Sequence, residues 1–163
     1  MREMDTVGLT YCNCQASIFE LSTSVLACSS NMFIRRYIYS DVAKQMDRLD
    51  FNIITPDLAF EEIKSRYGDA EQKQKYPPNV MYWLGYIYRY WSYTHEISIL
   101  NIYKMIRPSE LAGLYSAYHT LDPEMAIQRI IEAKKIKQQP NLEEAVNMYR
   151  EIIKKVDAYF DKG

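Results

Sequence analysis

From residue 31 onward, apolar residues recur at steps of three and four, the pattern of helices that bury one face. Ser, Thr, Asp or Asn stands before most of these segments, as at helix starts. Only 5 Gly and 6 Pro occur in 163 residues, which disfavours a turn-rich β protein. The pattern predicts an all-α fold, a single-domain bundle of about seven or eight helices around a central aromatic helix.

The predicted helices cover residues 32–40, 42–49, 58–67, 80–94, 99–106, 110–118, 125–137 and 141 to about 160. The predicted capping residues are Ser29, Ser30 or Asn31, then Asp41, Thr55, Asn79, Ser98, Ser109, Asp122 and Asn141, with Gly68 ending the third helix. Residues 1–28 have weak periodicity and many Ser, Thr and Cys. We expect them to be a weakly ordered N-terminal extension, or a short strand or turn, so the predicted domain is 29–163.

The predicted helix at 80–94 is apolar or aromatic on all sides. One face carries Val80, Leu84, Ile87 and Trp91. The opposite face carries Tyr82, Tyr86, Arg89, Tyr90 and Tyr93. Such a helix needs other groups packed on both of its faces. Either it is a central core helix, or its tyrosine face packs against another protein. A third alternative is that the tyrosine face stacks on the bases of single-stranded nucleic acid. Separately, Gly85 predicts a close crossing with another helix.

Composition narrows the class of protein. Hydrophobic residues make up 48% and charged residues 25%, with a net charge of −1 and a pI of about 6.1. These values exclude a disordered chain and disfavour a strongly basic nucleic-acid binder. The first residues do not form a secretory signal, and no apolar run reaches membrane-spanning length. We therefore expect a cytoplasmic protein without a membrane partner.

Metal and cofactor chemistry have little support in the sequence. Cys12, Cys14 and Cys28 could supply three zinc ligands, but no fourth ligand lies near them. We expect reduced thiols, no metal and no cofactor. No phosphate-binding, dinucleotide-binding or hydrolase motif occurs, and His119 precedes a helix cap rather than a catalytic partner. The chain is predicted not to be an enzyme, with an unrecognised catalytic site as the third functional hypothesis.

The segment 98–119 resembles two helices joined by a tight turn, and it is the basis of a DNA-binding alternative. Lys104 and Arg107 precede the second helix, which itself carries no Lys or Arg. Arg35 and Arg36 form a second, smaller basic cluster that could contact phosphate, although two adjacent arginines more commonly point to solvent. These four residues are the weak nucleic-acid candidates of a transcriptional repressor.

The last predicted helix carries a heptad-like apolar seam. Its members are Leu142, Ala145, Tyr149, Ile152, Val156 and Tyr159. The seam covers fewer than three heptads, too few to establish a coiled coil. Either the helix folds back onto the domain, or it reaches a partner or a second copy of the chain.

Three motifs resemble a group of small bacterial proteins. They are WLGYIYRYW (Trp83–Trp91), YKMIRP (Tyr103–Pro108) and YHTLDPEMAIQRI (Tyr118–Ile130), and the segment SSNMFIRRYIYSDVAKQMD (Ser29–Asp47) is similar to the opening of the same group. Together the resemblance covers roughly residues 29–133. The group comprises antitoxins and uncharacterised proteins found as the companion gene in toxin–antitoxin operons.

The resemblance implies an antitoxin that binds and neutralises a cognate toxin encoded beside it, and many antitoxins also bind operator DNA. The matching residues expected on the partner surface are Tyr86, Arg89, Tyr90, Tyr93 and His119. Tyrosine and arginine concentrate binding energy at protein interfaces, so the expectation agrees with the aromatic pattern. The expected partners are thus the toxin, with operator DNA and a second copy as alternatives.

Overall fold

The computed structural model describes residues 1–50, 52–134 and 142–160. Within these ranges the chain forms ten α-helices and no strand, so the predicted all-α class is confirmed. The helices are α1 Thr6–Val25, α2 Ser30–Ile38, α3 Asp41–Asp47, α4 Pro56–Tyr67, α5 Pro78–His95, α6 Ile99–Met105, α7 Pro108–Gly113, α8 Tyr115–Tyr118, α9 Pro123–Lys134 and α10 Leu142–Phe160. None of these helices is long and apolar enough to cross a membrane.

Most helix starts follow the predicted local chemistry. Ser29 and Ser98 accept the backbone N–H groups of residues 32 and 101, as expected of N-caps. Asp122 accepts from the backbone of Glu124 and starts α9. Gly68, with φ of 69°, ends α4 in the region that favours glycine. Short-range contacts of this kind were therefore predictable.

Two predicted helix starts, those of α3 and α5, need correction. Ser40, rather than Asp41, caps α3, because its hydroxyl accepts from the backbone of Ala43. The helix α5 begins at Pro78, whose missing N–H is tolerated at a first position, while the Asn79 amide donates to the Tyr115 hydroxyl instead of capping. The cap predicted at Asn141 lies outside the described residues.

The helix predicted over residues 110–118 is broken into two short helices. α7 begins at Pro108 rather than after Ser109, and it ends at Gly113. Leu114 then connects it to the four residues of α8. Pro108 and Leu111 are buried, so the short α7 is anchored by tertiary packing. This break and α1 account for ten helices where about eight were predicted.

The chain divides into two compact units, Met1–Arg129 and Ile130–Gly163, whose boundary falls inside α9. Because α1 lies within residues 1–28, the weakly ordered extension expected there is corrected, whereas the predicted domain at 29–163 stays a prediction. Residues 6–25 form α1, the longest described helix, and it belongs to the first unit. Its apolar periodicity is weak because the polar residues Gln15 and Ser22 are buried on its packed face, while apolar Leu9 and Leu21 are exposed.

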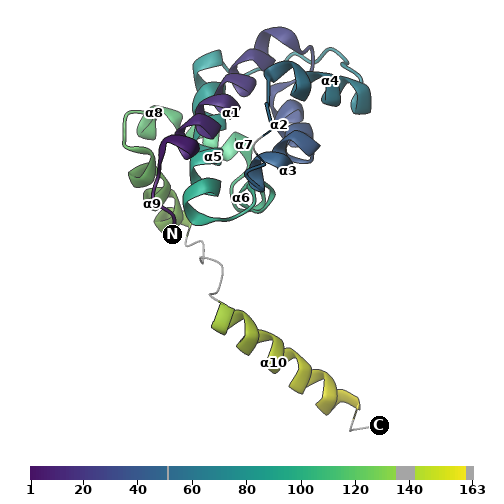
Figure 1. Cartoon of the computed structure of the whole chain (residues 1–163), viewed down its shortest axis with the longest axis vertical. Helices are drawn as coiled ribbons and strands as arrows, with labels where there is room; N and C mark the ends of the chain where they lie inside the picture. Colours follow the sequence, from purple (N-terminus) through teal and green to yellow (C-terminus); the bar gives the residue numbers. More distant parts are fainter. Residues whose placement is uncertain (51, 135–141, 161–163) are drawn as a thin grey trace. The chain divides into compact units, whose positions relative to one another are not determined.

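The first unit is built on α1 and α5, which lie against each other in Figure 1. Gln15 of α1 is fully buried and its side-chain amide donates to the Gly85 carbonyl oxygen at 2.8 Å. A Cβ atom on Gly85 would lie 2.9 Å from the Ala16 Cα and from the Gln15 carbonyl oxygen. The predicted close crossing at Gly85 is confirmed, and its neighbour is α1.

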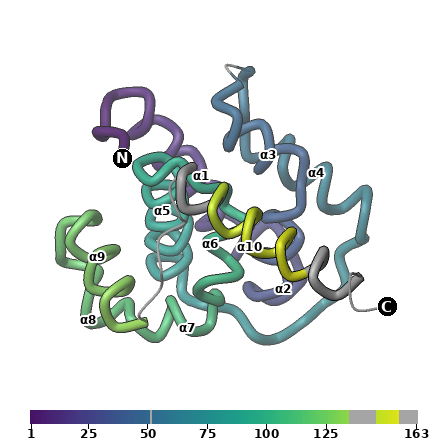
Figure 2. Tube along the Cα trace, turned by 90° about the horizontal axis from the view of Figure 1, so that it is seen from below, coloured from purple at the N-terminus to yellow at the C-terminus, as the bar shows by residue number. Residues whose placement is uncertain are grey.

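The remaining helices of the first unit flank this pair. α8 and α9 lie on one side of α5, whereas α2, α3 and α4 lie on the other side (Figure 1 and Figure 2). On the α2 side, the Phe19 ring packs edge to face on Phe33 and Tyr37, with ring centroids 5.3 and 5.1 Å apart. The rings of Phe33 and Tyr37 are 5.9 Å apart and tilted by 37°. This aromatic core leaves the other side of α5 available to α8.

The second unit contains α10, which begins and ends close to the predicted limits. Among its described side chains, Tyr149 is 69% exposed and Ile152 is 53% exposed. The two uses considered for its apolar seam, folding back or reaching a partner, stay predictions.

Candidate functional site

The five residues predicted for the partner surface have two different environments. Arg89 is 1% exposed and Tyr93 is 6% exposed, so both are buried. Tyr86 and Tyr90 are half-buried, and His119, on the turn after α8, is exposed. The expectation that Arg89 and Tyr93 lie on a partner surface is therefore corrected. The other three residues remain accessible.

Arg89 is held in a buried network that joins three elements. Its Nε and Nη2 atoms donate to the Gln15 side-chain oxygen at 3.0 and 2.8 Å. Its Nη1 atom donates to the Asp47 carboxylate at 2.7 Å, at the end of α3. Asp47 also accepts from the Ser92 hydroxyl and from the backbone N–H of Ile99. The guanidinium thus links α1, α3 and α5 and has a structural role.

Tyr93 is covered by the N-terminal residues. Its hydroxyl donates to Asp5 at 2.8 Å, and the Arg2 guanidinium lies 4.8 Å from its ring centroid. Hydrogen bonds from the Gly8 backbone and from Tyr93 keep the pKa of Asp5 below its usual range. A Cβ atom on Gly8 would lie 2.5 Å from the Tyr93 ring, so glycine permits this cover. Burial of Tyr93 thus depends on residues that were expected to be weakly ordered.

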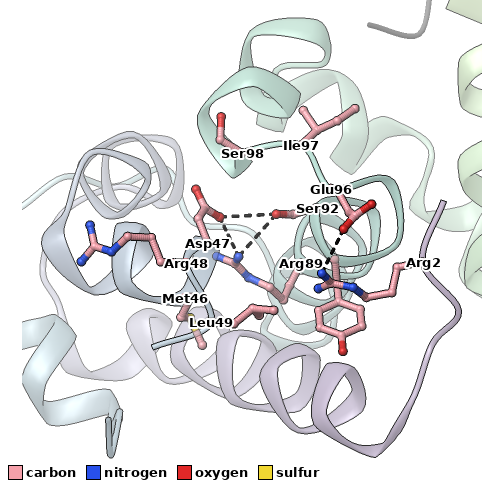
Figure 3. A pocket seen from close by; sticks show the side chains of 11 residues that line it. Arg2, Met46, Asp47, Arg48, Leu49, Arg89, Ser92, Glu96, Ile97 and Ser98 are labelled. Carbon is pink, nitrogen blue, oxygen red and sulfur yellow. Dashed lines mark hydrogen bonds and ion pairs between the residues drawn. The ribbon is translucent and has the colours of Figure 1, made fainter. Parts of the chain in front are cut away.

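A polar hollow of about 310 Å³ opens beside this network (Figure 3). The charged side chains that line it are Arg2, Asp47, Arg48, Arg89 and Glu96. Arg2 pairs with Glu96 at 2.9 Å, and Arg48 pairs with Asp50 at 3.0 Å. Since each lining charge already has a partner of opposite sign, we assign this hollow to the structural network.

On another side of α5, three tyrosines form a ladder one helical turn apart. The ring centroids of Tyr82 and Tyr86 are 6.4 Å apart, and those of Tyr86 and Tyr90 are 6.1 Å apart. The planes in each pair are tilted by less than 30°, so the rings stack. Residues i and i+4 lie on the same helix face, which explains the ladder.

A second stack faces the ladder from the α8 region. The Tyr115 and His119 rings lie 4.3 Å apart with planes at 13°. Tyr115 also meets the Trp83 ring edge to face at 5.7 Å and accepts a hydrogen bond from Asn79. These contacts attach α8 to the first half of α5.

Between the two stacks lies a groove of about 520 Å³, which we call the aromatic groove. From α5 it is lined by Asn79, Tyr82, Trp83, Tyr86 and Ile87. The rest of its lining comes from Glu20 of α1 and from Tyr115, His119, Leu121 and Pro123. Its volume and its mainly apolar wall with a few polar groups are typical of binding sites.

Two tyrosines of the ladder on α5 have raised pKa values. Burial, with smaller contributions from neighbouring groups, raises the pKa of Tyr86 to about 12. Burial also raises the pKa of Tyr90, and the carboxylates of Asp122 and Glu124 add to that rise. At neutral pH the ring faces therefore offer uncharged, π-rich surface with hydroxyl groups that donate and accept.

The basic candidates for nucleic-acid binding are distributed over different helices. Arg35 and Arg36 help line a shallow hollow on α2, where the Arg36 guanidinium lies 5.1 Å from the Tyr67 ring centroid. Lys104 is exposed on α6, and Arg107 lies over the Tyr103 ring at 4.6 Å. The short α7 that follows offers less surface to a DNA groove than the helix predicted over 110–118.

The cysteines lie near the N-terminal half of the first unit. Cys12 and Cys28 are buried, and Cys14 is half-buried with its thiol 3.6 Å from the Ile54 carbonyl oxygen. Burial raises the pKa of the Cys12 thiol to about 12. Within the part of the chain that the structure describes, no three His, Cys, Asp or Glu side chains gather as a metal site.

Sequence reasoning missed several groove residues, chiefly Trp83, Tyr115 and Glu20. The i,i+4 spacing of Tyr115 and His119 was a usable signal for the second stack. No pattern in the sequence indicates that Glu20 belongs to the groove, because it reaches the groove only through the packing of α1 on α5.

Comparisons with known proteins add nothing to this geometry. No protein-family model, no curated protein and no solved structure matches the chain.

Proposed function

We propose that this chain is an antitoxin-type interaction module, cytoplasmic and bacterial, which binds and neutralises a cognate toxin through the aromatic groove. The observation that supports the proposal is the pair of ring stacks, Tyr82–Tyr86–Tyr90 and Tyr115–His119, which flank an accessible groove of about 520 Å³. Tyrosine and tryptophan give large contact area at low cost in conformational entropy, and they are typical anchors of interfaces. The sequence resemblance to antitoxins of toxin–antitoxin operons supports a toxin protein as the partner.

The proposed action is steric and involves no catalytic step. A segment of the toxin would lie in the groove, so that the body of the first unit covers the active cleft of the toxin. Tyr86, Tyr90 and His119 are the contact residues kept from the sequence analysis, and Tyr82, Trp83 and Tyr115 join them. Arg89 and Tyr93 support this surface from beneath, because they fix α5 to α1 and to the N-terminal residues.

Co-expression with the product of the neighbouring gene tests the proposal. The neighbour alone should stop growth, and the wild-type chain should restore growth and copurify with it. The double variant Tyr86→Ala, Tyr90→Ala should bind the neighbour at least about tenfold more weakly, as expected when interface anchors are truncated.

The matched control is Tyr39→Ala, which removes a tyrosine that is 42% exposed on another part of the surface. It should rescue growth as well as the wild type does. The Tm of each variant is measured in parallel, so that loss of binding is separated from loss of folding. The proposal is wrong if the product of the neighbouring gene remains toxic when it is co-expressed with the wild-type chain. It is also wrong if the double variant Tyr86→Ala, Tyr90→Ala stays folded and restores growth fully.

A further inference from the structure

The charged groups around the aromatic groove are predominantly acidic. Of the residues that line the groove, Glu20 carries a carboxylate and none is Lys or Arg. Asp122 and Glu124, just beyond the lining, are close enough for their negative charge to raise the pKa of Tyr90. The groove therefore combines stacked aromatic faces with negative potential.

This combination favours binding of a positively charged group in the groove. The face of an aromatic ring carries negative electrostatic potential and attracts a cation placed over it. Five aromatic rings belong to the groove lining, those of Tyr82, Trp83, Tyr86, Tyr115 and His119. A guanidinium is planar and more weakly hydrated than an ammonium, so it stacks on such surfaces at lower cost of desolvation.

We propose that the aromatic groove binds the side chain of an arginine from the partner protein. This inference rests on the proposed function for the identity of the partner as a toxin, but it concerns the chemistry of the groove itself. The guanidinium stacks on the tyrosine ladder, its methylene stem lies along Ile87 and Leu121, and Glu20 supplies the opposite charge.

The chain itself contains a smaller example of the same chemistry. The Arg107 guanidinium lies 4.6 Å from the centroid of the Tyr103 ring, and the Arg36 guanidinium lies 5.1 Å from that of Tyr67. These distances are within the range of cation–π contacts. The groove lining contains five aromatic rings, whereas each of these two pairs contains one.

The test is a titration of the full chain with acetyl-arginine-amide, with acetyl-citrulline-amide as the neutral isosteric probe. Tyrosine side-chain NMR resonances report occupancy. The arginine probe should shift the Tyr86 and Tyr90 resonances in a saturable way, and the citrulline probe should bind at least about two- to fivefold more weakly, the ratio expected of an exposed cation–π contact.

Variants distinguish the contributions of the Tyr86 ring, the Tyr86 hydroxyl and the Glu20 charge to binding of the arginine probe. Tyr86→Phe keeps the ring and should retain binding, whereas Tyr86→Leu removes the ring and should weaken it. Glu20→Gln should weaken binding of the arginine probe only, while Glu61→Gln, a change on exposed α4 outside the groove lining, should leave it unchanged. Equal affinity for both probes, or saturable binding that survives Tyr86→Leu, overturns the inference.

The two proposals fail in distinguishable ways. If the arginine probe binds as described but the neighbouring toxin is neither bound nor neutralised, the groove chemistry stands and the antitoxin function is wrong. If the toxin is neutralised and Tyr86→Ala abolishes its binding, yet Glu20→Gln and substitution of every arginine on the toxin surface have no effect, the function stands and the arginine guest is wrong.

Discussion

At the scale of single residues, Arg89 shows how one charge can organise a helical core. Its guanidinium is 1% exposed and is bound by Gln15 and Asp47, and Gln15 in turn accepts from the Tyr37 hydroxyl at 3.1 Å. A buried guanidinium without such partners would carry a large desolvation cost. The network therefore specifies one packing of α1, α2, α3 and α5.

The variant Arg89→Ala should lower the free energy of unfolding by about 3–5 kcal/mol, because Asp47 would lose its buried partner. Urea denaturation measures the change. Arg35→Ala, at an exposed position of α2, is the matched control and should change stability by less than about 0.5 kcal/mol. An Arg89→Ala variant as stable as the wild type would contradict the structural role of the buried Arg89 network. The sequence-based prediction that Arg89 lies on a partner surface would then be favoured again.

At the scale of elements, the crossing of α1 and α5 is the main helix pairing of the first unit. Phe19 and Ala16 of α1 are fully buried, and the ring of Phe19 joins the aromatic core of α2. Gly85 allows the two helices to approach so closely that a Cβ atom would meet backbone atoms. A neighbouring backbone cannot rotate away as a side chain can, so the site tolerates no larger residue.

Gly85→Ala is therefore expected to destabilise the protein. Alanine favours a helix over glycine by about 1 kcal/mol, but forcing a methyl group against the Ala16 backbone costs about 1–3 kcal/mol or more. The expected net result is a lower urea midpoint than that of the wild type. Gly113→Ala is the control, since its Cβ would meet nothing within 4 Å, and it should be neutral or slightly stabilising. A Gly85→Ala protein as stable as Gly113→Ala would contradict the close crossing.

At the scale of the whole molecule, the first unit combines one packed core with one accessible aromatic groove. Its lining comes from α5, from Glu20 of α1 and from the α8 region. Figure 1 and Figure 2 show α8 on the opposite side of α5 from α2, α3 and α4. The polar hollow lies beside the buried ion pair instead, so its surface is committed to internal contacts. The proposed interaction with a partner requires such a division, because the core would hold the rings of the groove in place.

The stability of the whole molecule should depend on pH through His95. Burial lowers the pKa of His95 below its ordinary value of 6.5, and its Nε2 atom is buried with no hydrogen-bond partner among the described residues. The unfolded chain then binds a proton at higher pH than the folded chain does. This contribution to stability is complete above pH about 6.5 and decreases as the pH falls through the lowered pKa of the folded state.

Urea denaturation at pH 7.5, 6.5 and 5.5 measures this dependence. The wild type should lose stability toward pH 5.5, and His95→Gln, which cannot be protonated, should lose less over the same interval. Parallel pH profiles for the two proteins would show that His95 does not contribute.

The aromatic residues of α5 show how far the sequence predicts the candidate site. Tyr86, Tyr90 and His119 were predicted for a partner surface, and the structure places Tyr86 and His119 in the groove lining, with Tyr90 stacked on Tyr86. Arg89 and Tyr93 were predicted on the same face from the helical repeat. That face is covered at these two positions by α1 and by the residues before it, whose weak periodicity concealed their role.

The sequence by itself determined where most helices begin and end. Ser29, Ser98 and Asp122 bond to backbone groups two or three residues away, and such contacts form in almost any surroundings. Only the tertiary structure decided which rings of α5 are buried and which line the groove. A helical repeat gives the direction of a side chain from its own axis, but the neighbour that covers it comes from distant segments such as α1 and α8, whose packing depends on close contact between backbones and on ion pairs formed far apart in the chain.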